Sequence, residues 1–244
     1  MFNAVDIVVV GRFSGSQSLA AVGSTTALIN VFTNLFIGIS LGTNVLAARF
    51  YGAGKTKEMS ETVHTSIALA LVSGVAMAVI GLIFSRWSLE VMGTPEDVIG
   101  SSVAYFRVYF LGSSAVVLYN VGAGILQSVG DSRSPMVYLL VSSAANVALD
   151  LLFVLVFSWG IAGAAIATSL SQLICAWLVI RTLQRAHGDY RLDLKKIRPD
   201  GWLLKRMLVI GLPAGISSML YNITNVYVQK AINMLGTDTV AAWS

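Results

Sequence analysis

Runs of apolar residues long enough to cross a lipid bilayer recur along this chain, and they limit its fold more than any other feature. Six such runs occupy residues 26–50, 63–84, 103–126, 137–157, 161–180 and 207–232. A hydrocarbon core of about 30 Å takes roughly 20 apolar residues to cross as an α-helix, and only helices or closed barrels can span it. The sequence therefore predicts an all-α polytopic membrane protein.

The composition supports this class and argues against others. Of 244 residues, 56% are hydrophobic and only 11% are charged, and this composition is far from that of a soluble domain. The single cysteine, Cys175, lies in an apolar run, so neither a disulfide framework nor a thiolate metal cluster is expected. No nucleophile–base pair stands out, and we expect neither enzyme activity nor a cofactor.

Polar residues interrupt two neighbouring apolar runs around the turn at 158–160. Asn146 and Asp150 are four residues apart and share a helix face. Asp150 precedes Trp159 by nine residues and Thr168 follows it by nine, which at a 1.5 Å rise puts both about 13 Å from the same turn. Because a carboxylate inside a membrane helix is expensive, it marks a functional site by default. The group predicts a cation site.

Residues 1–12 form a shorter apolar segment that carries one acid, Asp6. The segment is too short to span a bilayer and resembles the second half of a truncated helix. Asp6 precedes the turn near Gly15 by nine residues, which predicts the same depth as Asp150. The segment NAVDIVV at residues 3–9 also aligns with NITNVYV at 222–228, which indicates parallel repeats of the kind found in transporters.

The positive charges alternate between the two ends of the predicted helices. Of the sixteen Lys and Arg residues, twelve lie in the loops after the runs that end at 50, 126 and 180. By the positive-inside rule, these loops, including the long basic loop 185–200, face the cytoplasm. This distribution is a topology signal and does not indicate a nucleic-acid partner.

Several motifs, taken in order, resemble the multidrug and toxic compound extrusion (MATE) antiporters. They are VDIVVVGR with LAAVG, ARFYGAGK, AYFRVYFLG, GDSRSP, NVALD followed by GIAGAAIAT, and IGLPAG. The resemblance implies a twelve-helix protein of two six-helix lobes, of which this chain holds about seven transmembrane helices. Residues 1–184 would form the first lobe, with a truncated first helix. Residues 185–202 would be a cytoplasmic linker, and 203–244 the first helix of a C-terminal lobe that is missing from the chain.

The resemblance also implies a function: export of small organic cations, such as drugs, across the cytoplasmic membrane, driven by Na⁺ or H⁺. The family's cation site maps onto Asp6, Asn146, Asp150 and Thr168, which would be the ligands if the ion is Na⁺. Many members of the family have proline at the position of Leu151. The sequence therefore does not decide whether the helix bends there.

Weaker candidates for lining a substrate cavity are polar or adaptable residues inside the apolar runs. These are Asn34, Asn44, Tyr119, Met219, Asn222 and Asn225. Two other functions remain open. One is a lipid-linked oligosaccharide flippase of the same superfamily, which would need a basic central cavity. The other is a membrane scaffold or receptor that transports nothing.

Overall fold

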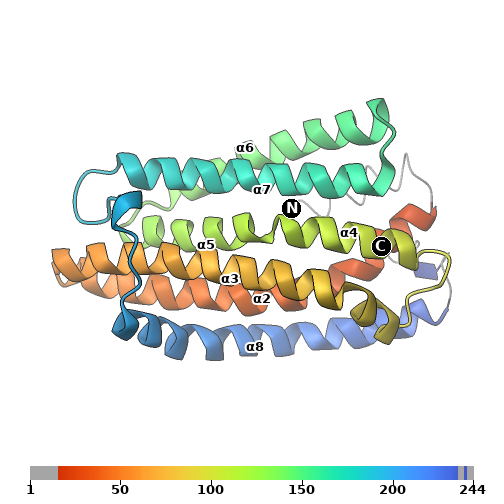
Figure 1. Cartoon of the computed structure of the whole chain (residues 1–244), viewed down its shortest axis with the longest axis horizontal. Coiled ribbons are helices and arrows are strands. Elements are labelled where there is room, and N and C mark those ends of the chain that lie inside the picture. Colours follow the sequence, from red (N-terminus) through yellow and green to blue (C-terminus); the bar gives the residue numbers. More distant parts are fainter. Residues whose placement is uncertain (1–15, 236–238, 241–244) are drawn as a thin grey trace.

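The computed structural model of the chain describes residues 16–235 and 239–240, which form helices joined by loops (Figure 1). In chain order the helices are α2 (Ser16–Gly52), α3 (Thr56–Val91), α4 (Ile99–Leu111), α5 (Ser113–Ser128), α6 (Arg133–Asp150), α7 (Gly160–Arg185) and α8 (Gly201–Asn233). Among the described residues, five helices are long and apolar enough to cross a membrane, and there are six if the bent pair α4–α5 is counted as one span. The prediction of an all-α polytopic membrane protein is confirmed. The segment 1–12 lies outside the described residues.

The run at 103–126 is bent, whereas the sequence predicted one uninterrupted helix. The axes of α4 and α5 differ by 42°, and the break falls at Gly112. At the bend the hydroxyl of Ser169 on α7 donates to the carbonyl oxygen of Val108, 3.2 Å away. A Cβ at Gly112 would lie 2.6 Å from the same hydroxyl oxygen, so only glycine allows α7 this close. A side chain that enters the backbone ladder of a helix is a recognised cause of a kink.

The run at 137–157 also departs from a uniform α-helix. It is α-helical up to Asp150 and continues as a π-helical segment, Leu151–Val156. The amide of Phe157 then donates to the carbonyl of Leu152, and the amide of Trp159 donates to the carbonyl of Phe153. The chain reverses through left-handed φ angles of 55° at Ser158 and 53° at Gly160. The predicted turn at 158–160 is confirmed, with a wider helix leading into it.

Aspartate side chains cap the starts of α6 and α8. Asp131 Oδ1 accepts the amide of Ser134 at the start of α6, and Asp200 Oδ1 accepts the amide of Leu203 at the start of α8. The hydrogen bond from the Ser134 side chain is the main reason that the pKa of Asp131, which lies in the loop before α6, is below its usual value. Both caps satisfy amide groups that a helix leaves unpaired at its first turn.

Aromatic side chains of α4 fill the centre of the bundle. Phe106 and Phe110 are fully buried and stack with ring centroids 4.5 Å apart. Phe32 of α2 meets Phe110 edge to face at 5.6 Å. On the other side α3 contributes Gly81, where a Cβ would lie 2.1 Å from the Phe110 ring. The glycine makes room for the ring and lets α3 and α4 pack closely.

The loops that carry most of the Lys and Arg residues lie at one end of the bundle. The α2–α3 loop, the α5–α6 loop and the α7–α8 linker are all at the left end in Figure 1, and the α3–α4 and α6–α7 loops are at the right end. We call the left end, with Lys55, Arg133, Arg185 and Lys196 among its cations, the basic end.

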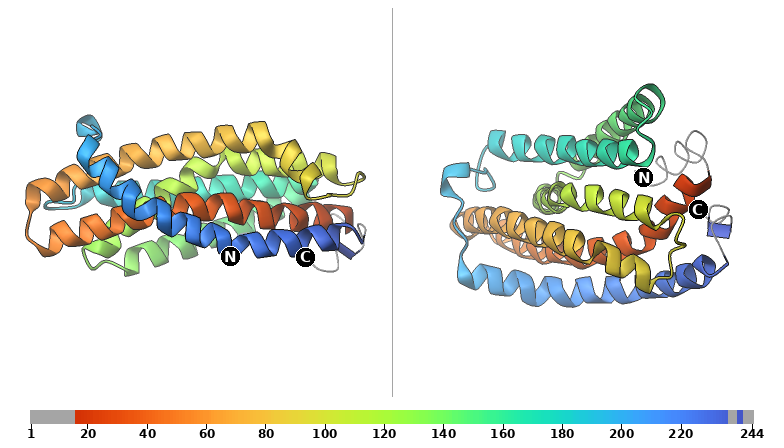
Figure 2. Two further views of the ribbon diagram at one scale, coloured as in Figure 1. Left: turned by 90° about the horizontal axis from the view of Figure 1, so that it is seen from below. Right: turned by 45° about the vertical axis from the view of Figure 1, so that its right-hand side comes forward.

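Helix α8 runs along the edge of the bundle beside α2 (Figures 1 and 2). Glycines four residues apart on both helices face each other: Gly38 and Gly42 on α2, and Gly211 and Gly215 on α8. A Cβ at Gly38 would lie 2.2 Å from the Cα of Gly215. Small residues at this spacing let membrane helices approach until their backbones touch.

Candidate functional site

The hairpin of α6 and α7 buries three polar side chains among apolar and small residues. Asn146 and Asp150 on α6 are fully buried, and Thr168 on α7 is 1% exposed. The two arms approach closely because α7 begins with small residues. A Cβ at Gly163 would lie 3.0 Å from the Cβ of Phe153. The run GIAGAAIAT thus places its threonine against α6.

Among the described residues, hydrogen bonds join the arms of this hairpin at three levels, and the one furthest from the turn at 158–160 links the hydroxyls of Tyr138 and Thr182 over 2.6 Å. Asn146 Nδ2 donates to Thr168 Oγ1 over 3.3 Å. Further from the turn, the hydroxyl of Ser142 donates to the carbonyl oxygen of Ser171. Ser142, Ser171, Asn146 and Thr168 are all buried. The two arms therefore contact each other through polar side chains inside the bundle. The serines were not among the residues predicted from the sequence, where serine in an apolar run carries little signal.

The register of the hairpin differs from the one expected from a uniform rise. Asn146, rather than Asp150, lies level with Thr168 and bonds to it. The π-helical segment Leu151–Val156 explains the shift, because a π-helix winds more residues into each turn and so advances less per residue. Asp150 follows Asn146 by one helical turn, about 6 Å nearer to the turn at 158–160.

The chemistry of this group suits a small cation. Asn146 Oδ1 is buried and has no hydrogen-bond partner among the described residues. Leaving a buried acceptor unsatisfied costs free energy, so such an atom calls for a partner. An amide oxygen, a hydroxyl and a carboxylate on one hairpin are the oxygen ligands that hard cations prefer. The carboxylate of Asp150 can equally take up a proton.

The fourth predicted ligand, Asp6, lies outside the described residues. Of the other three, which the sequence grouped from their spacing around the turn, Asn146 and Thr168 are in contact, and Asp150 is buried one helical turn further along α6. Stacked aromatic rings cover the same end of the hairpin: Trp159 lies 5.2 Å from both Phe153 and Phe157, measured between ring centroids.

A second polar feature is a cavity of about 640 Å³ between α2 and α8. It is lined by Asn30, Asn34, Ser217, Ser218, Tyr221 and Asn222. Two of these, Asn34 and Asn222, were substrate-cavity candidates from the sequence, and they come from segments nearly 190 residues apart. Amides, hydroxyls and one aromatic ring make its wall, and none of the lining residues that the structure describes is charged.

The remaining substrate-cavity candidates lie elsewhere. Asn44 is half-buried against Gly124 of α5, and the Tyr119 hydroxyl donates to the carbonyl oxygen of Pro135 over 3.0 Å. Met219 is half-buried on α8, and Asn225 is exposed on it. Asn30, Ser217 and Ser218 also line the cavity, and the sequence did not predict them as lining residues. The spacing of four between Asn30 and Asn34, and between Ser218 and Asn222, is a signal that could have found Asn30 and Ser218.

Comparison with known proteins gives consistent matches along the chain. The MatE family model matches residues 1–152. "Probable multidrug resistance protein YoeA" of Bacillus subtilis (strain 168) is 32% identical over 246 residues, covering 98% of this chain and 53% of that protein. A "FAD transporter" of Shewanella oneidensis is 26% identical over 255 residues, covering 99% of this chain and 54% of that protein.

A solved structure has the same fold. It is described as the inward-facing conformation of a multidrug resistance MATE family transporter of the MOP superfamily, and it matches with a TM-score of 0.90 at 27% identity. The match covers 99% of this chain and 56% of that one. The chain thus spans about half the length of the relatives that it matches. The chain belongs to the MATE family of membrane transporters.

Proposed function

We propose that this chain is the first half of an ion-coupled exporter, in which Asn146, Asp150 and Thr168 form the coupling site. Residues 1–184 make its first lobe, 185–202 the linker between lobes, and 203–244 the start of the second lobe. Asp6 completes the site from the first helix. The coupling ion is Na⁺ or H⁺, and no other cofactor takes part.

The observation that carries this proposal is the buried polar group of the α6–α7 hairpin. Asn146 and Asp150 are fully buried, and the Oδ1 atom of Asn146 has no hydrogen-bond partner among the described residues. A purely structural group would be expected to satisfy that oxygen internally. A site that binds and releases a cation leaves a ligand oxygen open for the ion.

The π-helical segment supplies a way to couple ion binding to movement. It follows directly after Asp150, and π-helical turns are less stable than α-helix and occur often at functional sites. Protonation of Asp150, or Na⁺ on its carboxylate, changes the charge between α6 and α7. That change in charge shifts the equilibrium between two packings of the hairpin. The packing of the hairpin in turn shifts the lobe between its inward- and outward-facing states.

The basic end of the bundle faces the cytoplasm in this proposal, and the turn at 158–160 faces outside. Substrate enters from the cytoplasm and contacts the cavity between α2 and α8, where Tyr221 offers a π-face and Asn34 and Asn222 offer amides. An aromatic face attracts organic cations. The substrates in this proposal are organic compounds, for which the multidrug names of relatives give support, and most of them are cations.

The flippase alternative needs cations around a central cavity, to hold a pyrophosphate-linked lipid. The described lining residues of the α2–α8 cavity are uncharged, and Asp150 puts an acid inside the α6–α7 hairpin. These features favour the exporter. A scaffold that transports nothing would have no use for a buried amide oxygen held open beside a carboxylate.

The test is efflux from membrane vesicles that contain a longer protein with this chain as its first half. A fluorescent organic cation is loaded, and a Na⁺ gradient and a pH gradient are imposed in separate experiments. We expect efflux to follow one of the two gradients and to collapse when that gradient is dissipated. Efflux that ignores both gradients, or none at all from correctly inserted protein, would reject ion-coupled export.

A further inference from the structure

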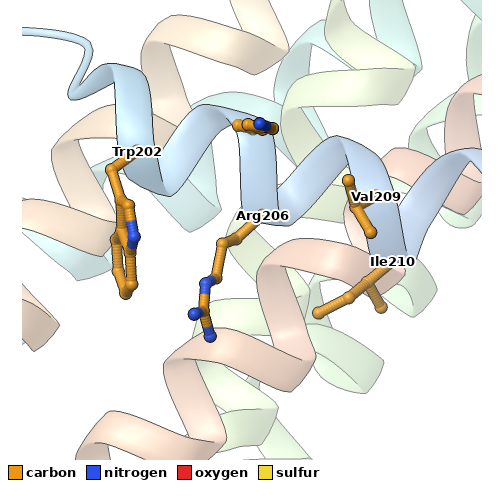
Figure 3. Close-up of a pocket in the computed structure, with 5 residues that line it drawn as sticks. Trp202, Arg206, Val209 and Ile210 are labelled. Atoms are coloured by element: carbon orange, nitrogen blue, oxygen red, sulfur yellow. The ribbon is translucent and has the colours of Figure 1, made fainter.

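A groove of about 440 Å³ lies on the outer side of α8, near the basic end of the bundle (Figure 3). It is lined by Trp202, Lys205, Arg206, Val209 and Ile210. The guanidinium of Arg206 lies over the Trp202 ring, 4.4 Å from its centroid, and Figure 3 shows the two side chains next to each other. Within the described part of the chain, neither Lys205 nor Arg206 forms an ion pair.

The groove sits where a helix leaves water for the bilayer. Asp200 caps α8, Trp202 is in its first turn, and an apolar run begins directly after Arg206, at Met207. On α7, which ends at the same end of the bundle, Arg181 lies over Trp177 in the same way, 5.0 Å from the ring centroid. Tryptophan and arginine gather at the level of the lipid headgroups.

The groove continues into an exposed apolar stripe on the same side of α8. Val209, Ile216 and Leu220 are 64%, 48% and 60% exposed, and their spacing of seven and four keeps them on one helix face. A different side of the helix carries the polar residues Ser217 and Asn222 of the α2–α8 cavity. The polar side suits a protein or substrate partner, whereas the apolar stripe suits acyl chains.

We infer that this groove binds an anionic phospholipid. Lys205 and Arg206 hold the phosphate group, Trp202 packs against the glycerol region, and an acyl chain lies along Val209, Ile216 and Leu220. Such a lipid matches the groove in charge, because neither Lys205 nor Arg206 has an anion partner among the described residues. It also matches the groove in shape, because the two cations lie at the headgroup level and the apolar stripe continues from them along α8. The inference does not depend on the proposed transport function, because the coupling site plays no part in it.

The test uses the full chain in detergent and counts retained lipid by native mass spectrometry. The chain is titrated with phosphatidylglycerol or with phosphatidylcholine of the same acyl length. The variant is Lys205→Gln with Arg206→Gln. The matched control is Lys55→Gln with Lys57→Gln, which removes two cations from the same end of the bundle, where their side chains are 56% and 84% exposed.

We expect the wild-type chain to prefer phosphatidylglycerol, and the variant to bind it roughly tenfold or more weakly. The control should bind as the wild type does. Equal binding of both lipids by the wild type, or an equal loss in the control, would overturn the inference. A dimer that weakens in the variant, with no change in lipid binding, would assign this face to a second copy of the chain and would also overturn it.

Discussion

His64 holds the linker between α7 and α8 against α3 through both of its ring nitrogens. Nδ1 lies 2.7 Å from the carbonyl oxygen of Ser60, which can only accept, so Nδ1 donates. Nε2 lies 3.1 Å from the amide of Asp193, which can only donate, so Nε2 accepts. Thr65 next to it accepts the amide of Asp200. The ring must therefore be neutral, because a second proton on Nε2 would point at the Asp193 amide hydrogen.

Replacing this histidine should loosen the linker. In His64→Ala the amide of the half-buried Asp193 loses its acceptor, which costs about 1 kcal/mol, and its hydrogen exchange should become roughly fivefold faster. Hydrogen–deuterium exchange of a peptide covering 189–200 measures this.

The other histidine of the chain provides the control. His187 is exposed on the same linker, and His187→Ala should leave exchange at Asp193 unchanged. If the two variants behave alike, His64 does not fasten the linker.

At this scale the sequence predicted which residues meet but not how they pair. Asn146, Asp150 and Thr168 were grouped because a carboxylate in an apolar run is rare and the three flank one turn. The pairing of Asn146 with Thr168 depends on the π-helical segment after Asp150. Nothing local in LLFVLV distinguishes π- from α-helix, so this register could not be derived from the sequence.

At the scale of helices, α2 and α8 cross so closely that their backbones touch. A Cβ at Gly42 would lie 2.2 Å from the carbonyl oxygen of Met207, and one at Gly215 would lie 2.5 Å from that of Leu35. Both neighbours are backbone atoms, so the helices would have to move apart to admit a side chain. We expect this contact to carry much of the stability of α8.

Gly38→Ala should therefore separate the two helices. Overpacking costs typically about 1–3 kcal/mol, and each kcal/mol lowers the Tm by roughly 2–4 °C in a chain of this size. The Tm in detergent, followed by tryptophan fluorescence, measures the loss. Gly52→Ala is the control on the same helix, because a Cβ there meets nothing within 4 Å. A Tm for Gly38→Ala equal to that of the control would show that the crossing is not tight.

The six apolar runs predicted the helices well, because bilayer thickness fixes how long an apolar helix must be. The bend at Gly112 escaped prediction for a physical reason. Its cause, the hydroxyl of Ser169 on the Val108 carbonyl, comes from a helix 61 residues further along the chain. A bend imposed by a distant partner leaves no pattern in the bent segment itself.

At the scale of the whole molecule, the chain covers about half the length of its relatives, and α8 presents a largely exposed surface. Tyr221, on the wall of the α2–α8 cavity, is 80% exposed. A cavity that must close around a substrate needs a second wall. The relatives are about twice as long as this chain, and we propose that their second half supplies this wall as a second lobe.

The chain expressed alone should therefore insert but not transport. Reconstituted by itself, it should give no more gradient-dependent efflux of a fluorescent organic cation than protein-free vesicles. The longer protein, at equal protein content, provides the positive control. Robust efflux by the chain alone would mean that one lobe suffices, as a dimer of identical copies, and the two-lobe proposal would fail.

The central claim is that the hairpin group around Asp150 couples ion movement to export, and Asp150→Asn in the longer protein tests it most directly. The change removes the charge but keeps the shape. A central acid costs roughly 2.5–3.5 kcal/mol on insertion, so its removal should not impair entry into the bilayer. Asp189→Asn, the same change at an exposed linker position, is the control. With equal amounts in the membrane, gradient-driven efflux should be abolished in Asp150→Asn and unchanged in Asp189→Asn. Wild-type efflux by Asp150→Asn would contradict the account.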